Sequence, residues 1–407
     1  MKKEGNVFAR NSNRRSFLKG GTVAAGAATL GAALLPDRLA AFDDDDRDRA
    51  PITPGDIAIL TFLSALEQVE ADLWLQYAEL GGVTSAVPGG IGLAGNDLKF
   101  NGKLVNTGVA TNYVLALQVL DTDMPQYITD NTDDEISHHS FLNNYLASKG
   151  GRPIDLSEFA ILPPSQVSGV PQNPRLTNLK QLTIDTTFWQ RYRSSTLNPD
   201  FGGKFENAVP DLAKGQHPAI PVDNADLALN PDGTITNHLQ AIANTAGFHF
   251  AFIEQGGTSL YPTLAQKVTN LEVLRVLLSI GGSETMHFQT WHDKAGNATN
   301  ITDPSQNLTF PNLNDGMDPN PTGTSADPAS DFQTNLIMPE PTLFLSKSLG
   351  PVAIIRPTAD FDGGAVAAVQ GFAADGLFLN PATGQNTGIV NRLMRLAEEA
   401  DEARRGF

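Results

Sequence analysis

One arrangement of acidic and histidine residues occurs twice in this chain and restricts the folds open to it. Each copy has a single glutamate in an apolar stretch, followed further along by the motif Glu-x-x-His. The two copies are Glu67 with Glu135 and His138, and Glu254 with Glu284 and His287. Residues three apart lie on one face of an α-helix, so each Glu-x-x-His directs both side chains towards the same point. Four carboxylates and two imidazoles on four helices predict a dinuclear metal site inside a helix bundle.

Composition alone does not account for this repetition. Histidine makes up 7 of the 407 residues, so a given glutamate has a histidine three residues later about one time in sixty. The two copies also agree in detail, because the lone glutamate of each is followed seven residues later by an aromatic residue, Trp74 or Tyr261. We interpret the copies as two similar halves of one bundle.

Start and stop signals frame four long helices. Thr53 before Pro54 is typical of an N-cap followed by proline at the first helical position, and the glycines at 81–82 are typical of a stop. The second helix is expected from residues 123–125 to the glycines at 150–151, the third from about 237 to 261, and the fourth from about 271 to 295. Glu67 then lies mid-helix on an apolar face, where a carboxylate without a partner is costly and requires a cation.

The segments between and after these helices are rich in proline, glycine and asparagine. Residues 83–122 and 152–236 are expected as insertions, the second with a helical stretch at 179–192. So long a second connection suits a crossover that places helices two and three side by side. Residues 296–407 are expected as a loop-rich extension, with loop at 302–331, a strand near 352–355 and short helices at 364–374 and 389–404. We therefore predict an all-α fold with one bundle at 54–295 and large loop insertions.

The N-terminal residues are expected to be a targeting signal. Arg14 and Arg15 within NRRSFLK, followed by a Gly/Ala-rich apolar run at residues 20–35, resemble a twin-arginine export signal. The run is about 16 residues long, shorter than the roughly 20 that a membrane span needs. We expect residues 1–41 to be cleaved as a signal peptide, the twin-arginine export machinery to be a partner, and the protein to be periplasmic or secreted.

The composition excludes several classes of function. The chain has no cysteine, which excludes thiolate zinc sites, iron–sulfur clusters, cysteine nucleophiles and disulfides. Its net charge of -17 argues against nucleic acid or an anionic membrane as a partner, because both bind basic surfaces. Any bound metal must therefore be held by oxygen and nitrogen ligands.

The sequence resembles the ferritin-like superfamily, and more narrowly the exported ferritin-like proteins that include the desiccation-related proteins. The stretch DDEISHHSFLNNYLASKGG and the glutamate seven residues before an aromatic carry this resemblance, which covers residues 54–295. It implies a ferritin-like four-helix bundle with a long crossover between helices 2 and 3. It also implies two iron or two manganese ions, with Glu67 and Glu254 as terminal ligands, Glu135 and Glu284 as bridges, and His138 and His287 as imidazole ligands.

Polar residues near these ligands have alternative interpretations. Glu70 lies one turn after Glu67 and is an alternative to it, whereas Gly257 stands at the matching place in helix three. Asp134 is expected on a solvated face, and His139 at the surface or beside a ligand. His249 and His292 are interpreted as partly buried histidines with a hydrogen-bond partner, the alternative being a hydrogen bond to a ligand. Trp74 and Tyr261 are interpreted as packing residues.

The predicted ligand set supports two hypotheses of function. Iron and manganese both accept carboxylate and imidazole ligands, and bridging carboxylates hold two such ions close together. The main hypothesis is an oxidoreductase that reacts with O2 or peroxide, a class that includes ferroxidase, peroxidase and catalase-like activity. The alternative is a non-catalytic structural or metal-binding protein related to stress or desiccation. The sequence does not distinguish iron from manganese, and it specifies neither an organic substrate nor an oligomeric state.

Overall fold

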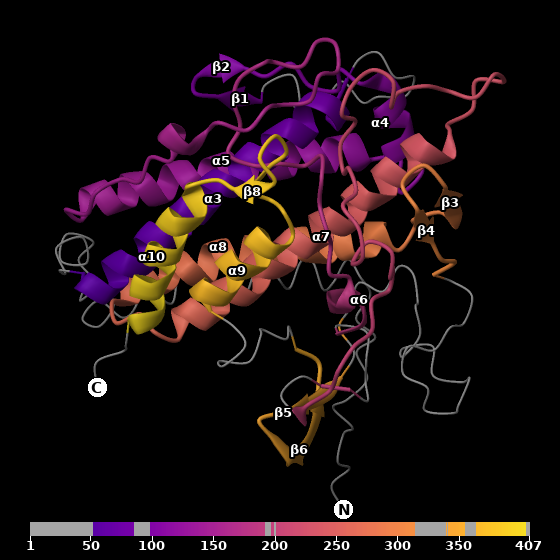
Figure 1. Cartoon of the computed structure of the whole chain (residues 1–407). Coiled ribbons are helices and arrows are strands. Elements are labelled where there is room, and N and C mark those ends of the chain that lie inside the picture. The colour runs from indigo at the N-terminus through magenta and orange to yellow at the C-terminus, as the bar shows by residue number, and fades with distance from the viewer. Residues whose placement is uncertain are drawn as a thin grey trace, which may run out of the picture. The chain divides into compact units, whose positions relative to one another are not determined.

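Four long helices form a bundle that dominates the structure (Figure 1). The computed structural model describes residues 52–84, 98–191, 197–198, 201–313, 339, 341–354 and 364–403. The four helices are α3 (Pro54–Gly81), α5 (Met124–Ser148), α7 (Asn237–Ala265) and α8 (Leu271–Ala295). Helix α3 packs along α5, and α7 packs along α8. The predicted all-α fold with a long crossover between the second and third bundle helices is confirmed; the predicted signal peptide lies outside the described residues.

The start of α3 is fixed by its own cap and by a contact with the other half of the bundle. The Thr53 hydroxyl accepts a hydrogen bond from the backbone N–H of Asp56, and the Asp56 side chain accepts one from the backbone N–H of Thr53, which is a capping box. Asp56 also accepts a hydrogen bond of 2.8 Å from the backbone N–H of Thr269, in the turn between α7 and α8. The predicted bounds of this helix are therefore confirmed, and its first turn is tied to the second helix pair.

Helices α7 and α8 begin at side-chain caps. Thr236 caps α7, and Asn270 caps α8 by accepting hydrogen bonds from the backbone N–H groups of Glu272 and Val273. Helix α7 runs through Pro262 to Ala265, four residues beyond the predicted end. A proline removes only one helical hydrogen bond donor, and the last turn after it is buried, so packing extends the helix past the sequence signal.

The first insertion contains a hairpin and a short helix. Strands β1 (Lys99–Phe100) and β2 (Lys103–Leu104) pair antiparallel through Asn101 and Gly102, whose φ values of 50° and 73° are typical of a type I′ turn. The run at 111–120, whose type the sequence left open, forms α4 (Thr111–Leu117), which packs against α7 and α3. Residues 85–97 of this insertion lie outside the described part of the chain.

The crossover at 152–236 is mostly irregular chain held against the bundle. It contains a 3₁₀ helix η2 (Ser157–Phe159) and helix α6 (Thr187–Arg191). The helix predicted at 179–192 is wrong over residues 179–186. There the Leu182 backbone pairs with His217 as a β-bridge, and the backbone N–H of Ile184 donates to the carbonyl of Leu212. These long-range hydrogen bonds replace the local ones that a helix would need.

Two side chains of α3 hold this crossover in place. Asp72 accepts hydrogen bonds from the backbone N–H groups of Leu176 and Thr177 and from the Thr177 hydroxyl, at 3.0, 2.9 and 2.6 Å. Two turns further along α3, Glu79 forms a buried ion pair with Arg175. The crossover is therefore anchored to the outer side of α3.

The C-terminal extension adds hairpins and two helices. The hairpins are β3 (Ile301–Asp303) with β4 (Leu308–Phe310), β5 (Thr342–Phe344) with β6 (Ser346–Val352), and β7 (Leu379–Asn380) with β8 (Gln385–Asn386). The predicted helices form as α9 (Ala365–Ala374) and α10 (Ile389–Glu402). The loop expected at 302–331 contains the β3–β4 hairpin, and the strand expected near 352–355 ends at Val352. Residues 314–331 and Ile355 lie outside the described residues.

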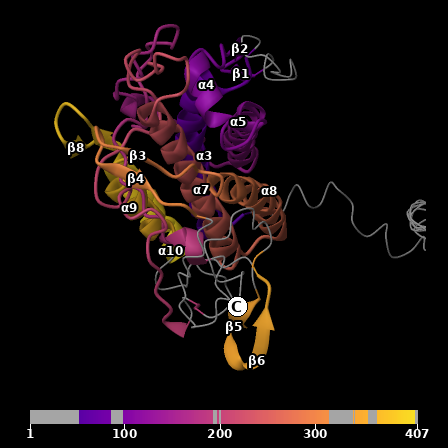
Figure 2. The same ribbon diagram turned by 90° about the vertical axis from the view of Figure 1, so that its right-hand side faces the viewer.

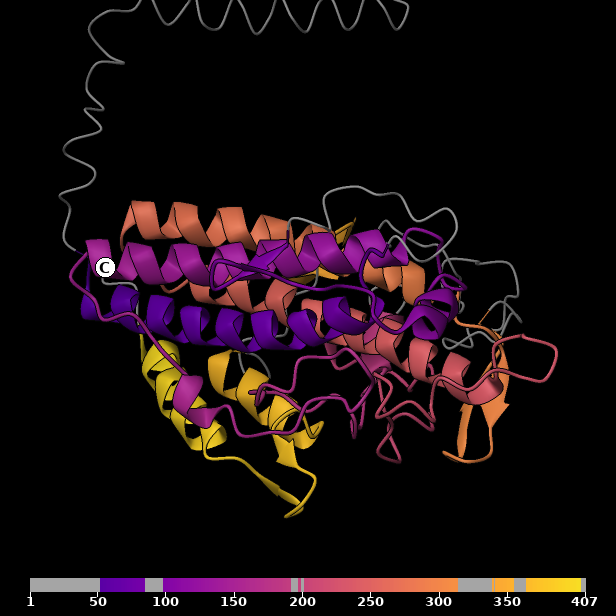
Figure 3. The same cartoon turned by 90° about the horizontal axis from the view of Figure 1, so that it is seen from above.

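The added helices cover one side of the bundle. Helix α10 packs along α3 and α9, and α9 also contacts α7. Figures 2 and 3 show α9 and α10 on the side of α3 and α7, with α5 and α8 on the opposite side. Among the described helices, none combines the length and the apolar character that crossing a membrane requires.

Candidate metal centre

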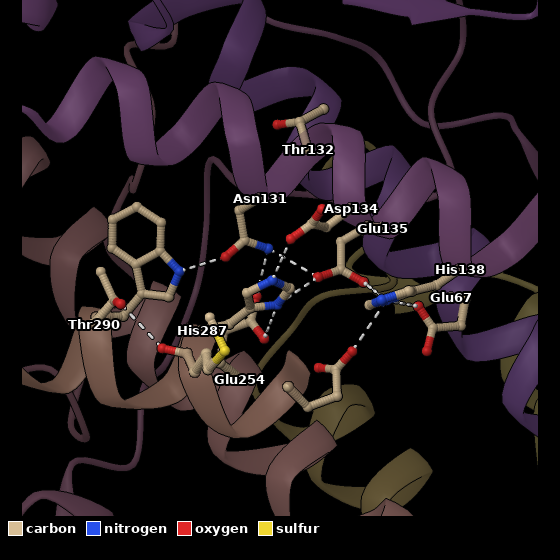
Figure 4. Close-up of polar contacts among 12 residues, drawn as sticks. Glu67, Asn131, Thr132, Asp134, Glu135, His138, Glu254, His287 and Thr290 are labelled. Carbon is tan, nitrogen blue, oxygen red and sulfur yellow. Dashed lines mark hydrogen bonds and ion pairs between the residues drawn. The ribbon is translucent and has the colours of Figure 1, made fainter. Parts of the chain in front are cut away.

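The six predicted ligand residues meet in the middle of the bundle, one or two from each long helix. Helices α3 and α7 supply one glutamate each, and α5 and α8 each supply a glutamate and a histidine. The set is Glu67, Glu135, His138, Glu254, Glu284 and His287. All six are buried: the three glutamates at 135, 254 and 284 have no exposed surface, and each histidine is 9% exposed. Figure 4 shows both imidazoles directed into the space between the helices.

The potential ligand atoms form two overlapping groups. In the first, which we call subsite 1, one atom from each of Glu67, Glu135, His138 and Glu284 lies within 4.8 Å of the others. In the second, subsite 2, the same holds for Glu135, Glu254, Glu284 and His287. Glu135 and Glu284 belong to both groups, so each of these carboxylates could contact an ion in either subsite.

The two histidines reach the shared carboxylates from opposite sides. Nδ1 of His138 lies 3.1 Å from Oε2 of Glu135 and 3.2 Å from Oε1 of Glu284. Nδ1 of His287 lies 3.0 Å from Oε1 of Glu135. Glu135 therefore offers a different oxygen to each histidine, while the imidazole ring centres lie 6.1 Å apart. This is the relation expected of one bridging carboxylate between two imidazole ligands.

Several polar atoms at this centre are buried without a hydrogen-bond partner among the described residues. They are Oε2 of Glu67, Oε2 of Glu254, both carboxylate oxygens of Glu284, and Nδ1 of His287. Each unsatisfied buried polar atom costs about 1 to 3 kcal/mol, and more when it is charged. Five such atoms on four of the six residues, all within the two groups, fit positive ions between them. The donor set of oxygen and imidazole nitrogen fits iron or manganese.

Without an ion, protons must compensate the clustered carboxylates. Burial raises the pKa of Glu135 to about 7, and the neighbouring charge of Glu254 adds to this effect. Burial also raises the pKa of Glu284 well above its usual range, again with help from neighbouring carboxylates. Burial alone would lower the pKa of His138, but the close carboxylates of Glu135, Glu284 and Glu67 raise it far above the usual range. Binding of metal ions at this centre would therefore displace protons.

Glu70, the alternative to Glu67, lies in neither subsite. It is buried, and burial together with the charges of Glu284 and Glu67 raises its pKa well above the usual range. On the opposite helix, Gly257 leaves space for the Glu284 carboxylate, because a Cβ atom at Gly257 would collide with Oε2 of Glu284. The glycine that interrupts α7 is thus explained by close approach.

Three residues that the sequence did not assign to the site contact the ligands. Asn131 donates hydrogen bonds from Nδ2 to Oε1 of Glu135 and to Oε1 of Glu254, at 2.8 and 2.9 Å. Asp134, expected on a solvated face, is half exposed and also accepts a hydrogen bond of 2.9 Å from Nε2 of His287. Tyr261, expected only to pack, donates its hydroxyl hydrogen to Glu67.

The sequence spacing between two of these residues and a ligand on the same helix weakly indicates their contacts. Asn131 lies one turn before Glu135, and Tyr261 lies two turns after Glu254, so both share the face of a ligand. Asp134 directly precedes Glu135 and reaches a ligand on the other helix pair, which local spacing does not reveal.

The remaining histidines and Trp74 are not in either subsite. His249 is fully buried and shares a hydrogen bond of 2.7 Å with the Tyr77 hydroxyl, and burial lowers its pKa to about 3. His292 contacts the carbonyl of Trp189, and His139 contacts Gln68. Trp74 stacks on Phe250 and Trp291, with ring centres 4.8 and 5.2 Å apart, as predicted for a packing residue.

Comparisons with known proteins agree with this architecture. A family profile described as the ferritin-like domain matches residues 55–297, which is more than half of the chain. A profile of signal sequences for the twin-arginine translocation pathway matches residues 11–31, so the predicted export to the periplasm or beyond is confirmed. No curated protein and no solved structure matches the chain.

Proposed function

The chain belongs to the ferritin-like domain family, and from that premise we propose that it is an exported non-haem dimetal protein. Subsites 1 and 2 would each hold one iron or manganese ion, with Glu135 and Glu284 shared between them. The proposed activity is oxidation or reduction with O2 or peroxide, in the manner of a ferroxidase, a peroxidase or a catalase. The observation that carries the proposal is the set of five buried ligand atoms without a hydrogen-bond partner.

Charge balance supports two divalent ions at this centre. The two subsites contain four carboxylates, whose total charge of about −4 matches two divalent cations. Buried charges persist in proteins only when paired or bound to metals, and both imidazoles are neutral as metal ligands. An apolar bundle would otherwise lose stability by keeping these six side chains inside.

The surroundings of the centre restrict what can reach it. Among the six ligand residues, the two histidines have the largest exposed fractions, 9% each, and they come from α5 and α8. The aromatic side chains of Trp74, Phe250 and Trp291 pack together in the core beside the ligands. A pair of redox-active ions here would exchange electrons with a small oxidant such as O2 or peroxide. The ligand side chains would hold the ions, and their burial would limit the access of bulk water.

Elemental analysis of the protein exported by its native host tests the proposal. We expect two equivalents of iron or manganese per chain, and loss of most of this metal in Glu135→Gln and Glu284→Gln. Glu399→Gln, an exposed site on α10, serves as the matched control and should keep both ions. Full metal content in both ligand variants would refute the ligand assignment.

Reaction with oxidants separates the two hypotheses of function. The metal-loaded protein should consume H2O2 or O2 faster than the same concentration of free ions. A protein that carries two ions and leaves both oxidants unconsumed would support the alternative, a non-catalytic metal-binding or structural protein related to stress. A purified protein without stoichiometric metal would favour the purely structural version of that alternative.

A further inference from the structure

We propose that the two subsites are inequivalent and fill in order, with subsite 2 binding its ion first and more tightly. This inference rests on the proposed function, because it assumes that both subsites bind metal. Asn131 and Asp134 are the positioning residues: they contact ligands of subsite 2 and have no counterpart at subsite 1.

The first difference concerns the two histidines. Nε2–H of His287 donates to Oδ2 of Asp134 at 2.9 Å, which fixes the ring and leaves Nδ1 as the nitrogen that faces the carboxylates. A carboxylate behind a ligand imidazole also makes the imidazole a stronger donor to the metal. For His138, all described carboxylate contacts are with ligand residues of subsite 1, namely Glu67, Glu135 and Glu284.

The second difference concerns the carboxylates. Asn131 donates to Oε1 of Glu254 and Oε1 of Glu135, while its own Oδ1 accepts a hydrogen bond of 2.7 Å from Nε1 of Trp291. The indole N–H can only donate, so the orientation of the Asn131 amide is determined. The amide holds Glu254 by one oxygen and leaves Oε2 without a hydrogen bond, facing Nδ1 of His287 at 3.4 Å across the space where an ion would bind. Glu67 in subsite 1 is held by a single hydroxyl, that of Tyr261.

The near-symmetry of the two halves shows that these supports are missing from subsite 1. The residue four before Glu284 is Ile280, which stands where Asn131 stands relative to Glu135 and has no polar side chain. The residue directly before Glu284 is Ser283, which stands where Asp134 stands and carries no charge. Subsite 2 therefore has a carboxylate bonded to its histidine and an amide bonded to its own terminal glutamate. Subsite 1 shares the amide only through Glu135, and the additional carboxylate near it, Glu70, makes no described hydrogen bond to His138.

Ordered ligands bind an ion at lower cost, since less side-chain freedom is lost on binding. Asp134 also adds a negative charge close to subsite 2, which favours a divalent cation there. Loss of such an outer hydrogen-bond partner typically weakens metal binding by about 10- to 100-fold. The first ion should therefore bind at subsite 2 and the second at subsite 1.

Titration of the metal-free exported protein with Mn2+, followed by calorimetry and electron paramagnetic resonance, tests this order. We expect two binding steps, with the signal of an isolated Mn2+ ion growing up to one equivalent and diminishing as the second ion couples to the first. Asp134→Asn should weaken the first step by about 10- to 100-fold and the second step less. Asp133→Asn, the exposed neighbouring site, is the matched control and should change neither step.

A reciprocal variant tests the symmetry argument directly. By the near-symmetry of the two halves, Ser283→Asp should place a carboxylate near His138, and it should strengthen the second step while leaving the first unchanged. Two ions that bind in one indistinguishable step, or equal weakening of both steps in Asp134→Asn, would overturn the inference and leave the dimetal site intact. Failure to bind any ion would instead refute the proposed function.

Discussion

Gly257 on α7 lies against the carboxylate of Glu284 on α8, so closely that a Cβ atom at position 257 would stand less than 3.0 Å from Oε2. We expect Gly257→Ala to displace this carboxylate, which belongs to both subsites, and to lower the affinity for metal by about tenfold or more. Alanine favours a helix over glycine by about 1 kcal/mol, so the metal-free fold should remain stable. Metal content after dialysis and thermal unfolding of the metal-free protein measure the two effects.

Gly282 provides a matched control on α8. It is exposed, and no atom lies within 4 Å of the position its Cβ would take. Gly282→Ala should therefore raise the free energy of unfolding by about 0.5 to 1 kcal/mol and leave metal content unchanged. Equal metal retention in the two variants would show that the contact between Gly257 and Glu284 does not shape the site.

Removal of metal should lower the thermal stability of the whole bundle. An ion present at about 1,000 times its dissociation constant adds about 4 kcal/mol to the free energy of unfolding. Chelation leaves four carboxylates and two histidines buried together, compensated only by protons. Calorimetry of loaded and chelated protein should show a lower unfolding temperature after chelation, restored by adding Fe2+ or Mn2+. Identical unfolding temperatures would contradict a metal-filled site.

His238 should make stability fall at alkaline pH. Its Nε2 lies 3.0 Å from Oδ1 of Asp226 and its Nδ1 lies 2.7 Å from Oδ2 of Asp303, which joins the start of α7 to the crossover and to β3. The hydrogen bond to Asp226, opposed by burial and supported by Asp303, raises the pKa of His238 to about 9. The folded value exceeds the unfolded value of about 6.5, so this contribution is complete below pH 6.5 and is lost as pH rises through 9.

The pH dependence can be measured by urea unfolding between pH 6 and pH 10. The native protein should lose stability over this range, and His238→Gln should lose less, because glutamine does not titrate. The substitution should have its largest effect at pH 6, where the imidazolium interacts with both carboxylates. A parallel pH dependence in the two proteins would rule out His238 as its source.

The ion pair between Arg175 and Glu79 should be essential to the attachment of the crossover. Both residues are only 3% exposed, so Arg175→Met leaves the Glu79 carboxylate buried without its cation. We expect this change to lower the free energy of unfolding by about 3 to 5 kcal/mol, and the double variant with Glu79→Leu to recover much of the loss. A double-mutant cycle in urea measures the coupling; additive losses would exclude a direct interaction.

Local signals in the sequence predicted the elements whose ends depend on nearby residues. Thr53 and Pro54 start α3, and Gly81 ends it, because caps and stops act within a few residues. The helix expected at 179–186 failed for the opposite reason, since Leu182 bonds to His217, 35 residues further along. A partner so distant in sequence cannot be identified from a local pattern.

The candidate site likewise combines features that depend on nearby residues with features that depend on distant ones. Glu-x-x-His repeats are local, and the structure brings both of them to one point, as their spacing indicated. Asp134 and Tyr261 contact ligands 153 and 194 residues away in sequence, so their roles depend on how the helix pairs meet. The relative packing of two helix pairs is a tertiary property, and no single pair encodes it.

Each subsite takes three of its four residues from one helix pair and the fourth from the other. Helices α3 and α5 supply Glu67, Glu135 and His138, but subsite 1 is completed by Glu284 of α8; subsite 2 is completed in turn by Glu135 of α5. Neither helix pair alone therefore contains all four residues of a subsite. If the crossover between them were cut, the bound ions would act as cross-links between two separate polypeptides.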